Sequence, residues 1–259
     1  MKEILYEKKD HIGLITISCT ESLNILNSKL LIDLNKILEI VKNDRDIYCI
    51  VITGAGKKSF IAGAEITEMK DMGVLGARKY SIFGCRVLRN LESLAKPVIA
   101  AINGYTLGGG LELALSCDLR IASNNSIFGF PEVNIGIIPG WGGIQKLVRI
   151  VGLGKAKELV LTGLKINADE AFRIGLINKI VEEEKLTEEA LDLAKKIASN
   201  APIAVSLAKA AIDHGIGLGS NDAITYESEV FAQCFTTEDQ KDAMNAFIDK
   251  KKLEKFKNK

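Results

Sequence analysis

Apolar residues in the first two thirds of the chain follow two different periodicities. Short runs rich in β-branched residues are typical of buried strands, and longer stretches with helical spacing of apolar residues separate them. The predicted strands are 12–17, 47–53, 98–102, 119–122 and 177–181. Helices are expected over 30–41, with Asn27 or Ser28 as the N-cap, and over 80–94. Strands alternating with helices predict an α/β fold with parallel pairing and helices packed outside the sheet.

The pattern changes near Lys185 and is helical from there to the end of the sequence. Pro202 suits the first position of one helix, and Gly215 is expected just past its last turn. Thr237, with Gln240 three residues later, has the spacing of a capping box for the final helix. No low-complexity linker separates this region from the rest, so we expect it to pack on the core or on a neighbouring subunit.

Length and composition fit a folded, soluble protein. The chain has 259 residues, 47% of them hydrophobic and 26% charged, which excludes a disordered chain. Its formal net charge of +1 argues against a protein that binds nucleic acid by neutralising phosphates. The start of the sequence lacks an apolar signal core, and the five cysteines form no CxxC pair, so we expect a cytoplasmic protein with reduced thiols. The lysine-rich end is expected to be solvated, with a contact to an anion as the alternative.

Two stretches of the sequence resemble a membrane span and a phosphate-binding loop, but each lacks a required feature. Residues 98–115 are nearly all apolar, but Glu112 in their midst is too costly in lipid for a membrane span. Residues 54–59 resemble a phosphate-binding loop but lack the required spacing of glycine, lysine and hydroxyl residues. A buried strand, a turn and a buried helix fit residues 98–115 better than a membrane span does.

Histidine-based chemistry has little support, because His11 and His214 are the only histidines. No HExxH motif, Cys/His ligand cluster or GxSxG elbow occurs, which argues against zinc hydrolysis and Ser-His-Asp catalysis. Both histidines are expected to be structural. Acid–base chemistry must therefore fall to carboxylates.

One candidate carboxylate follows three consecutive glycines. A predicted strand runs into Gly108, Gly109 and Gly110, and then into a helix with Glu112 in its first turn. Glycines at a helix start carry a high backbone-entropy cost. One explanation is close packing of the helix on the sheet. The other is that bare N–H groups at the helix N-terminus face a developing negative charge.

A second candidate is Glu132, in an apolar and glycine-rich stretch. Pro131 fixes its own backbone and biases Phe130 towards extended geometry, which holds Glu132 rigidly. Taken alone, Glu132 fits a surface loop, but together with Glu112 it becomes half of an acid–base pair. A third segment, 60–66, has small residues that would let a ligand approach the backbone.

In this order and spacing, the three segments resemble the crotonase superfamily, and within it the enoyl-CoA hydratase group with its bacterial short-chain members. The resemblance runs over essentially the whole chain. Its most specific part is the glycine triplet with its glutamate, followed about twenty residues later by Pro-Glu. The matching segments are 22–27, 60–66, 96–104, 107–112, 128–132, 168–171, 228–229, 237–239 and 246–248.

The resemblance implies a ClpP/crotonase-like α/β fold, a spiral of ββα repeats. The spiral would form the catalytic core over residues 1–195, and the helical region 196–259 would build homo-oligomers, trimers or hexamers. The resemblance also implies an acyl-CoA thioester as substrate. It implies no metal, no cofactor beyond the CoA of the substrate, and neither a nucleic-acid nor a membrane partner.

The resemblance further implies roles for individual residues. The backbone N–H groups of Ala64 and Gly109 would form the oxyanion hole for the thioester oxygen. Glu112 would act on the water that attacks C3, and Glu132 would supply the proton at C2, with the roles reversed in dehydration. Further contacts to the substrate or its CoA are expected from Ala62, Glu65, Ile66, Lys58, Gly108, Trp141, Phe247 and Lys250.

Several positions depart from the usual family pattern. Glu21 stands in a turn where a lysine often assists CoA binding, and Thr67 stands where some relatives have a lysine. Lys57, Lys58 or the Lys250 of a neighbouring subunit are the substitutes that their positions suggest.

Two aromatic residues bear on the substrate, and the paired glutamates bear on the reaction. Phe130 makes the pocket floor more apolar, and Trp141 either shortens the acyl pocket in favour of four-carbon substrates or packs in the core.

The leading hypothesis is a hydro-lyase that interconverts a short-chain trans-2-enoyl-CoA, such as crotonyl-CoA, and a (3S)-3-hydroxyacyl-CoA. An enoyl-CoA isomerase of the same fold is the alternative, although such isomerases commonly keep one of the two carboxylates. A crotonase-fold RNA-binding protein is a further alternative, and the scattered basic residues of 74–94 argue against it.

Overall fold

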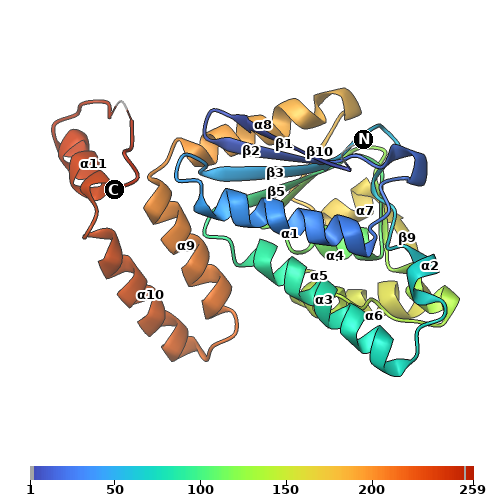
Figure 1. The fold of residues 1–259 in the computed structure, drawn as a ribbon. Coiled ribbons are helices and arrows are strands. Elements are labelled where there is room, and N and C mark those ends of the chain that lie inside the picture. Colours follow the sequence, from blue (N-terminus) through green and yellow to red (C-terminus); the bar gives the residue numbers. More distant parts are fainter. Residues whose placement is uncertain (1–2, 254) are drawn as a thin grey trace.

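Pairs of strands followed by helices repeat along the computed structural model, which describes residues 3–253 and 255–259 (Figure 1). The strands are β1 Ile4–Lys9, β2 Ile12–Ile17, β3 Cys49–Gly54, β4 Ser59–Ile61, β5 Val98–Ile102, β6 Tyr105–Leu107, β7 Leu119–Ser123, β8 Ile127–Gly129, β9 Lys165–Asn167 and β10 Lys179–Val181. The α-helices are α1 Ser28–Asn43, α2 Ile66–Met69, α3 Val74–Glu92, α4 Gly109–Ala114, α5 Gly143–Val151, α6 Leu153–Thr162, α7 Ala168–Arg173, α8 Leu186–Ala198, α9 Pro202–Gly215, α10 Ser220–Cys234 and α11 Glu238–Ile248. Short 3₁₀ helices cover Thr20–Ser22, Pro131–Ile135 and Glu183–Lys185.

Successive strands enter two different sheets, which makes the chain a spiral. One sheet has the order β1-β2-β3-β5-β7-β10, and all of its pairs are parallel except β1 with β2. The other sheet has the order β4-β6-β8-β9 and is parallel except for β8 with β9. Strands β3, β5 and β7 are thus each followed by a strand of the second sheet. The predicted spiral of ββα repeats is confirmed.

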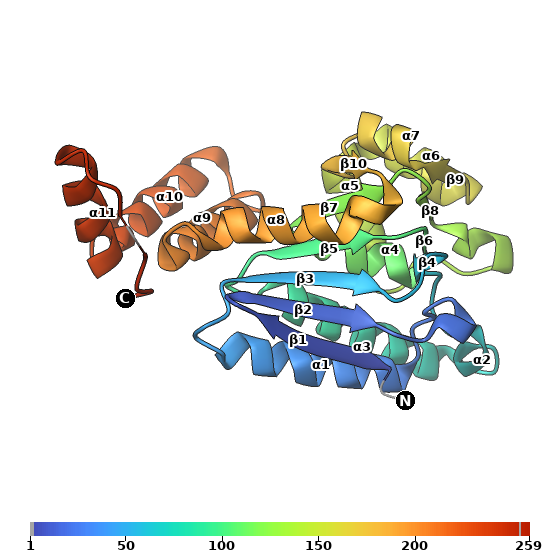
Figure 2. The same ribbon diagram turned by 90° about the horizontal axis from the view of Figure 1, so that it is seen from above.

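Both faces of the larger sheet are buried, which explains its near-continuous apolar strands. Alternate residues such as Ile15 and Ile50 face α1 and α3, whereas Leu14 and Val51 face α8 on the other side. Figure 2 shows α8 and the pair α1 and α3 on opposite sides of this sheet. The carboxyl ends of β3 and β5 lead into β4 and β6, and from there into α2 and α4.

The periodic segments were predicted well, and the short ones were not. The strand at 98–102 has the predicted bounds, and Asn27 caps α1 by accepting a hydrogen bond from the Leu30 N–H. Helix α3 starts at Val74 instead of residue 80, because its first turn is exposed and shows no apolar face. Strands β4, β6, β8 and β9 were missed because three residues are too few to show a period. Strand β1 was missed because charged residues fill its second half.

Helices α9, α10 and α11 extend away from the sheets, beyond the end of α8 (Figure 1). Pro202 is the first residue of α9, as predicted, but Gly215 is its last residue, so the helix continues one residue further than expected. The Thr237 side chain caps α11 through the Gln240 N–H, while the Thr237 N–H donates to a backbone carbonyl instead of closing a capping box. The predicted boundary between residues 195 and 196 lies in the last turn of α8, a helix that packs on the sheet; the division into two regions stays a prediction.

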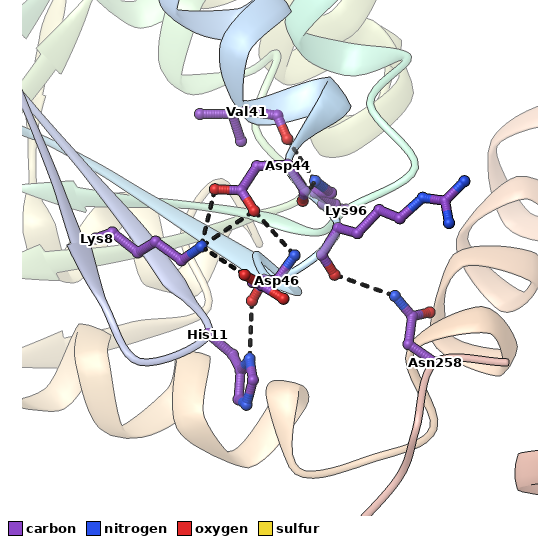
Figure 3. A network of polar contacts seen from close by, with 8 residues as sticks. Lys8, His11, Val41, Asp44, Asp46, Lys96 and Asn258 are labelled. Atoms are coloured by element: carbon purple, nitrogen blue, oxygen red, sulfur yellow. Dashed lines mark hydrogen bonds and ion pairs between the residues drawn. The ribbon is translucent and has the colours of Figure 1, made fainter.

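The end of the chain folds back onto α11 and the core. The buried carboxylate of Asp239 accepts hydrogen bonds from the backbone N–H groups of Lys257 and Asn258. The side chain of Asn258 donates to the Arg45 carbonyl, at the edge of the polar network in Figure 3. Lys257 forms an ion pair with Asp242 at 2.6 Å. This part of the lysine-rich end is therefore held by carboxylates of its own chain.

Beside that network, His11 has a structural role, as expected. Its ring is hydrogen-bonded to the Asp46 carbonyl (Figure 3). The same ring stacks on Tyr48 with 4.2 Å between the ring centroids. Lys96 donates to the carbonyls of Val41 and Asp44 and so closes the end of α1. None of the helices in the described part of the chain combines the length and apolarity needed to cross a bilayer.

Candidate functional site

The glycine triplet lies where three parts of the chain meet. Gly108 caps α4 with φ +50°, and a Cβ on it would stand 2.7 Å from Glu132 Oε1. A Cβ on Gly109 would stand 2.5 Å from the Trp141 ring. A Cβ on Gly110 would stand 2.1 Å from the carbonyl oxygen of Ile61. The packing explanation therefore applies to Gly110, which lets α4 pack on β4, and Gly108 leaves room for the Glu132 carboxylate; the explanation by N–H groups that face a developing charge stays a prediction.

Two backbone amides beside this point have no acceptor among the described residues. The Leu26 N–H donates to the Gly63 carbonyl at 2.9 Å, and the Leu26 carbonyl accepts from the Glu65 N–H at 2.8 Å. This parallel pairing leaves the Ala64 N–H, which lies between those two residues, without a hydrogen bond to Leu26. The Gly109 N–H is at the first position of α4, where a helix offers no acceptor of its own. Gly63 Cα lies 3.8 Å from the point that a Cβ on Gly108 would occupy, so the segments 62–64 and 107–109 are in contact.

Glu112 is buried and firmly held. Its Oε1 accepts hydrogen bonds from the backbone N–H groups of Trp141 at 2.7 Å and Gly143 at 2.9 Å. Burial raises the pKa of Glu112, and the two amides, together with the charge of Lys146, oppose that rise. The helix predicted from Gly109 onwards places this carboxylate in its first turn, as expected.

Glu132 differs from Glu112 in its surroundings. It follows Pro131, which starts the 3₁₀ helix Pro131–Ile135, and its Oε2 is buried without a hydrogen-bond partner among the described residues. Burial, supplemented by the nearby charge of Glu112, raises the pKa of Glu132 to about 7. A carboxyl with this pKa exchanges its proton near neutral pH, which suits an acid–base role.

The segment 136–143 that holds Glu112 is itself fastened to two helices. Ser81 on α3 donates to the carbonyl of Gly140 at 2.5 Å. Lys146 on α5 donates to Ser116 Oγ at 2.6 Å, and that hydroxyl donates to the backbone carbonyl of Glu112. The position of the carboxylate thus depends on α3, α4 and α5 together. These supports were not predicted from the sequence, in which the Gly142-Gly143 pair at the start of α5 was the available signal.

The other predicted contact residues lie at varying distances from the glutamates. The chain continues from β4 through Ala62 to α2, whose first residue, Ile66, is 53% exposed, while Glu65 caps α2 by accepting from the Thr67 N–H and hydroxyl. Trp141 is 3% exposed and belongs to the core, with its ring against Gly109. The reading of Trp141 as a core residue is therefore confirmed, and its ring is also the side chain that stands next to Gly109.

The basic residues predicted to bind CoA fall into two groups. Lys58 is exposed and lines a cavity of about 300 Å³ together with Lys57, which forms an ion pair with Glu183 at 3.6 Å. Phe247 and Lys250 lie at the end of α11, well apart from α2 and α4 in both views (Figures 1 and 2). A single chain therefore does not bring these two residues to the glutamates. Within the described residues, no group of three or more His, Cys, Asp or Glu side chains is placed to hold a metal ion.

Comparisons with known proteins show which family the chain resembles over its length. Residues 7–259 match the model of the family described as enoyl-CoA hydratase/isomerase. The chain is 51% identical to the short-chain-enoyl-CoA hydratase of Clostridium acetobutylicum, over 100% of this chain and 99% of that one. It is 44% identical to the crotonyl-CoA hydratase of Syntrophomonas wolfei, over 97% and 96%. The crystal structure of an enoyl-CoA hydratase from Bacillus anthracis superposes with a TM-score of 0.95 at 37% identity, over 100% of both chains.

Proposed function

Because the chain belongs to the enoyl-CoA hydratase/isomerase family, we propose that it is an enzyme that reversibly adds water to short-chain trans-2-enoyl-CoA thioesters. The product is a (3S)-3-hydroxyacyl-CoA, and the enzyme works in the cytoplasm without a metal or a further cofactor. One observation carries the proposal: the buried Glu112 and the partly buried Glu132, in unlike surroundings, lie beside two backbone amides that have no acceptor among the described residues. The similarity to two hydratases of short-chain substrates supports the choice of substrate.

The amides of Ala64 and Gly109 form the oxyanion hole. Adding water to the double bond pushes negative charge onto the thioester oxygen, and N–H donors fixed in position stabilise that charge without reorganising. Removing one such donor costs roughly 2.7–4 kcal/mol in known oxyanion holes. Backbone donors suit this task because they carry no net charge and are held by the pairing of Leu26 and by the start of α4.

The two glutamates divide the proton transfers. Glu112 accepts two N–H hydrogen bonds, which favour its charged form, so it acts as the base on the water that attacks C3. Among the described residues no donor reaches Glu132 Oε2, and the pKa of Glu132 is raised to about 7, so Glu132 gives the proton to C2. In dehydration Glu132 takes the α-proton and Glu112 returns water. The presence of both carboxylates favours hydration over double-bond isomerisation, which needs only one.

The CoA part of the substrate binds through the exposed lysines near the site. Lys57 and Lys58 line the cavity next to the turn that contains Glu21, and they replace the lysine that this turn lacks. Phe247 and Lys250 reach a site only from a neighbouring subunit, since α11 lies far from α4 of its own chain. Phe247 and Lys250 are therefore proposed as CoA contacts in the site of a neighbouring subunit.

Exposed apolar side chains on the last three helices support a homo-oligomer, a trimer or hexamer. Phe247 is 85% exposed, an unusual state for a large apolar side chain, and it is one of a group on α9–α11. The group comprises Ile212, Ile216, Leu218, Ile224, Phe231, Phe235, Met244, Phe247 and Ile248. A second copy of the chain that covers this surface would also supply Lys250.

Hydration of crotonyl-CoA tests the proposal directly. Purified protein mixed with crotonyl-CoA should remove the ultraviolet absorbance of the enoyl thioester as water adds across the double bond. A comparison with enoyl-CoA thioesters of six to ten carbons then measures the preference for short chains, which the Trp141 ring beside Gly109 favours. No change in absorbance with correctly folded protein would disprove the proposed function.

A further inference from the structure

Lys146, on α5, is a lysine held largely out of solvent, with a side chain that is 15% exposed. Its Nζ donates to Ser116 Oγ at 2.6 Å and lies 3.2 Å from a carboxylate oxygen of Glu92 on α3. Taking an ammonium group out of water costs free energy, which partners of this kind offset. An apolar side chain would fill the same space without that cost. Nothing in the proton transfers proposed above uses Lys146, so its charge needs an explanation.

The Ser116 hydroxyl extends the contact from Lys146 to the helix that carries Glu112. The hydroxyl donates its proton to the Glu112 carbonyl at 2.7 Å, the usual back-bond of a serine to a residue one turn earlier. With its proton engaged there, it can serve Lys146 only as an acceptor, and an ammonium group is purely a donor. Ser116 therefore joins α5 to α4 at the backbone of Glu112.

A second junction between the same two helices lies at the carboxylate of Glu112. Its Oε1 accepts from the N–H of Gly143, the first residue of α5, and from the N–H of Trp141 just before it. Both donors lie at the start of α5, where unpaired N–H groups and the helix dipole favour a negative charge. Glu112 is thus attached to α5 at both ends: its carbonyl through Ser116 and Lys146, and its carboxylate through the two amides.

Lys146 also acts on Glu112 through its charge. Burial raises the pKa of Glu112, and the charge of Lys146 opposes that rise after the loop amides do. The other titratable groups around Glu112 and Lys146 are Tyr80 and Glu92 of α3, Cys117 after α4, and Glu132. None of these four side chains is a cation. The ionised form of Glu112 is therefore favoured by Lys146 and disfavoured by its acidic neighbours.

We propose that Lys146 is a positioning residue for the catalytic base. It holds α4 in place against α5, so that the amides of Trp141 and Gly143 stay on the Glu112 carboxylate, and it keeps that carboxylate ionised. This inference rests on the proposed function, because Glu112 must be ionised to take a proton from the water that attacks C3. Lys146 itself touches no reacting atom and acts through Glu112.

The test measures steady-state hydration of crotonyl-CoA by the wild-type enzyme, by Lys146→Met and by the control Arg149→Met. Methionine is a long side chain without a charge or a donor, and Arg149 is an exposed residue of the same helix. We expect Lys146→Met to lower kcat by roughly two- to tenfold, the range for one hydrogen bond, with little change in KM. Arg149→Met should leave both unchanged. A wild-type kcat in Lys146→Met would overturn the inference.

The pH profile provides a measurement that a merely structural role would not change. Removing the lysine raises the pKa of Glu112, so on the acid side kcat/KM of Lys146→Met should fall at a higher pH than that of the wild-type enzyme. An acid limb at the wild-type position would overturn the role assigned to the charge.

Ser116→Ala tests the same connection from its other end. If Lys146 acts partly through this hydroxyl, the loss of kcat in the double variant should be smaller than the product of the two single losses. A loss equal to that product would contradict the connection through Ser116.

Lys146→Met is expected to fold, because it exchanges a largely buried charge for an apolar side chain and leaves Glu92 hydrated at 46% exposure. Its melting temperature checks this. If the wild-type enzyme fails to hydrate crotonyl-CoA, the proposed function is wrong. If it hydrates crotonyl-CoA and Lys146→Met keeps the wild-type kcat and pH profile, only the role of Lys146 is wrong.

Discussion

Replacing Gly143 by alanine should displace the catalytic base while leaving its chemistry intact. A Cβ at this position would lie 2.6 Å from Glu112 Cγ, 2.7 Å from Phe130 Cζ and 2.9 Å from Glu112 Oε1. Ordinary contacts of a Cβ are 3.4–4 Å, so the Glu112 side chain would have to move by about 0.8 Å. It cannot move freely, because its carboxylate is tied to the amides of Trp141 and Gly143 itself.

The expected result is a large loss of turnover with a modest loss of stability. A misplacement of about 1 Å at a reacting group can lower the rate on the order of 10²-fold. Overpacking of a buried site typically costs about 1–3 kcal/mol of unfolding free energy. Substrate binding should change little, because the atoms nearest to the added Cβ belong to Glu112 and Phe130 and not to the residues that supply the oxyanion amides. Steady-state hydration of crotonyl-CoA and thermal melting of the same preparation measure both effects.

Gly154→Ala is the matched control for this substitution. Gly154 lies in α6, and a Cβ there would meet no atom within 4 Å. Alanine at such a position should be neutral or stabilise by roughly 0.4–1 kcal/mol. Wild-type turnover in Gly143→Ala, with Gly154→Ala behaving as described, would refute the idea that the loop amides fix Glu112 for catalysis.

Two further predictions concern the glutamates. Glu112→Gln and Glu132→Gln should each lower kcat for hydration by roughly 10²–10⁴-fold with little change in melting temperature, and a variant that keeps near-full activity removes that residue from the mechanism. Hydration starts with the proton on Glu132 and dehydration starts with it on Glu112, so both directions use the pair of glutamates that carries one proton. Because the pKa of Glu132 is raised to about 7, activity in both directions should fall as the pH rises through 7 and this proton is lost. Values of kcat/KM measured in both directions between about pH 6 and 8 test this, and an activity that stays constant over this range would contradict it.

The sequence predicted the parts of the molecule in which one physical signal dominates. The strand 98–102 is buried on both faces, and the Asn27 cap uses a side chain that the sequence displays directly. The glycine triplet with Glu112 was predicted from the chemistry of its residue types, and the structure gives it the expected helix start.

The remaining features depend on contacts between segments far apart in the chain. Nothing local to Gly143 or Trp141 shows that their amides meet Glu112, about thirty residues earlier. Tyr80 has helical spacing like its neighbours, and only the three-dimensional structure shows that its buried hydroxyl has no hydrogen-bond partner within residues 3–253 and 255–259. Phe247 lies in the matching segment 246–248 and Lys250 follows it, yet the fold places α11 far from α4, which carries Glu112.

Because the segment 136–143 joins α3 and α5 to Glu112, it makes activity a sensitive reporter of local opening. Ser81 and Cys85 of α3 both donate to the Gly140 carbonyl, and an irregular segment held by so few hydrogen bonds opens at lower free energy than buried strands do. Mild heat or a low denaturant concentration should therefore abolish turnover while the circular dichroism signal of the sheets persists. The difference between the midpoint of inactivation and the midpoint of the spectroscopic melt would measure the local opening of residues 136–143.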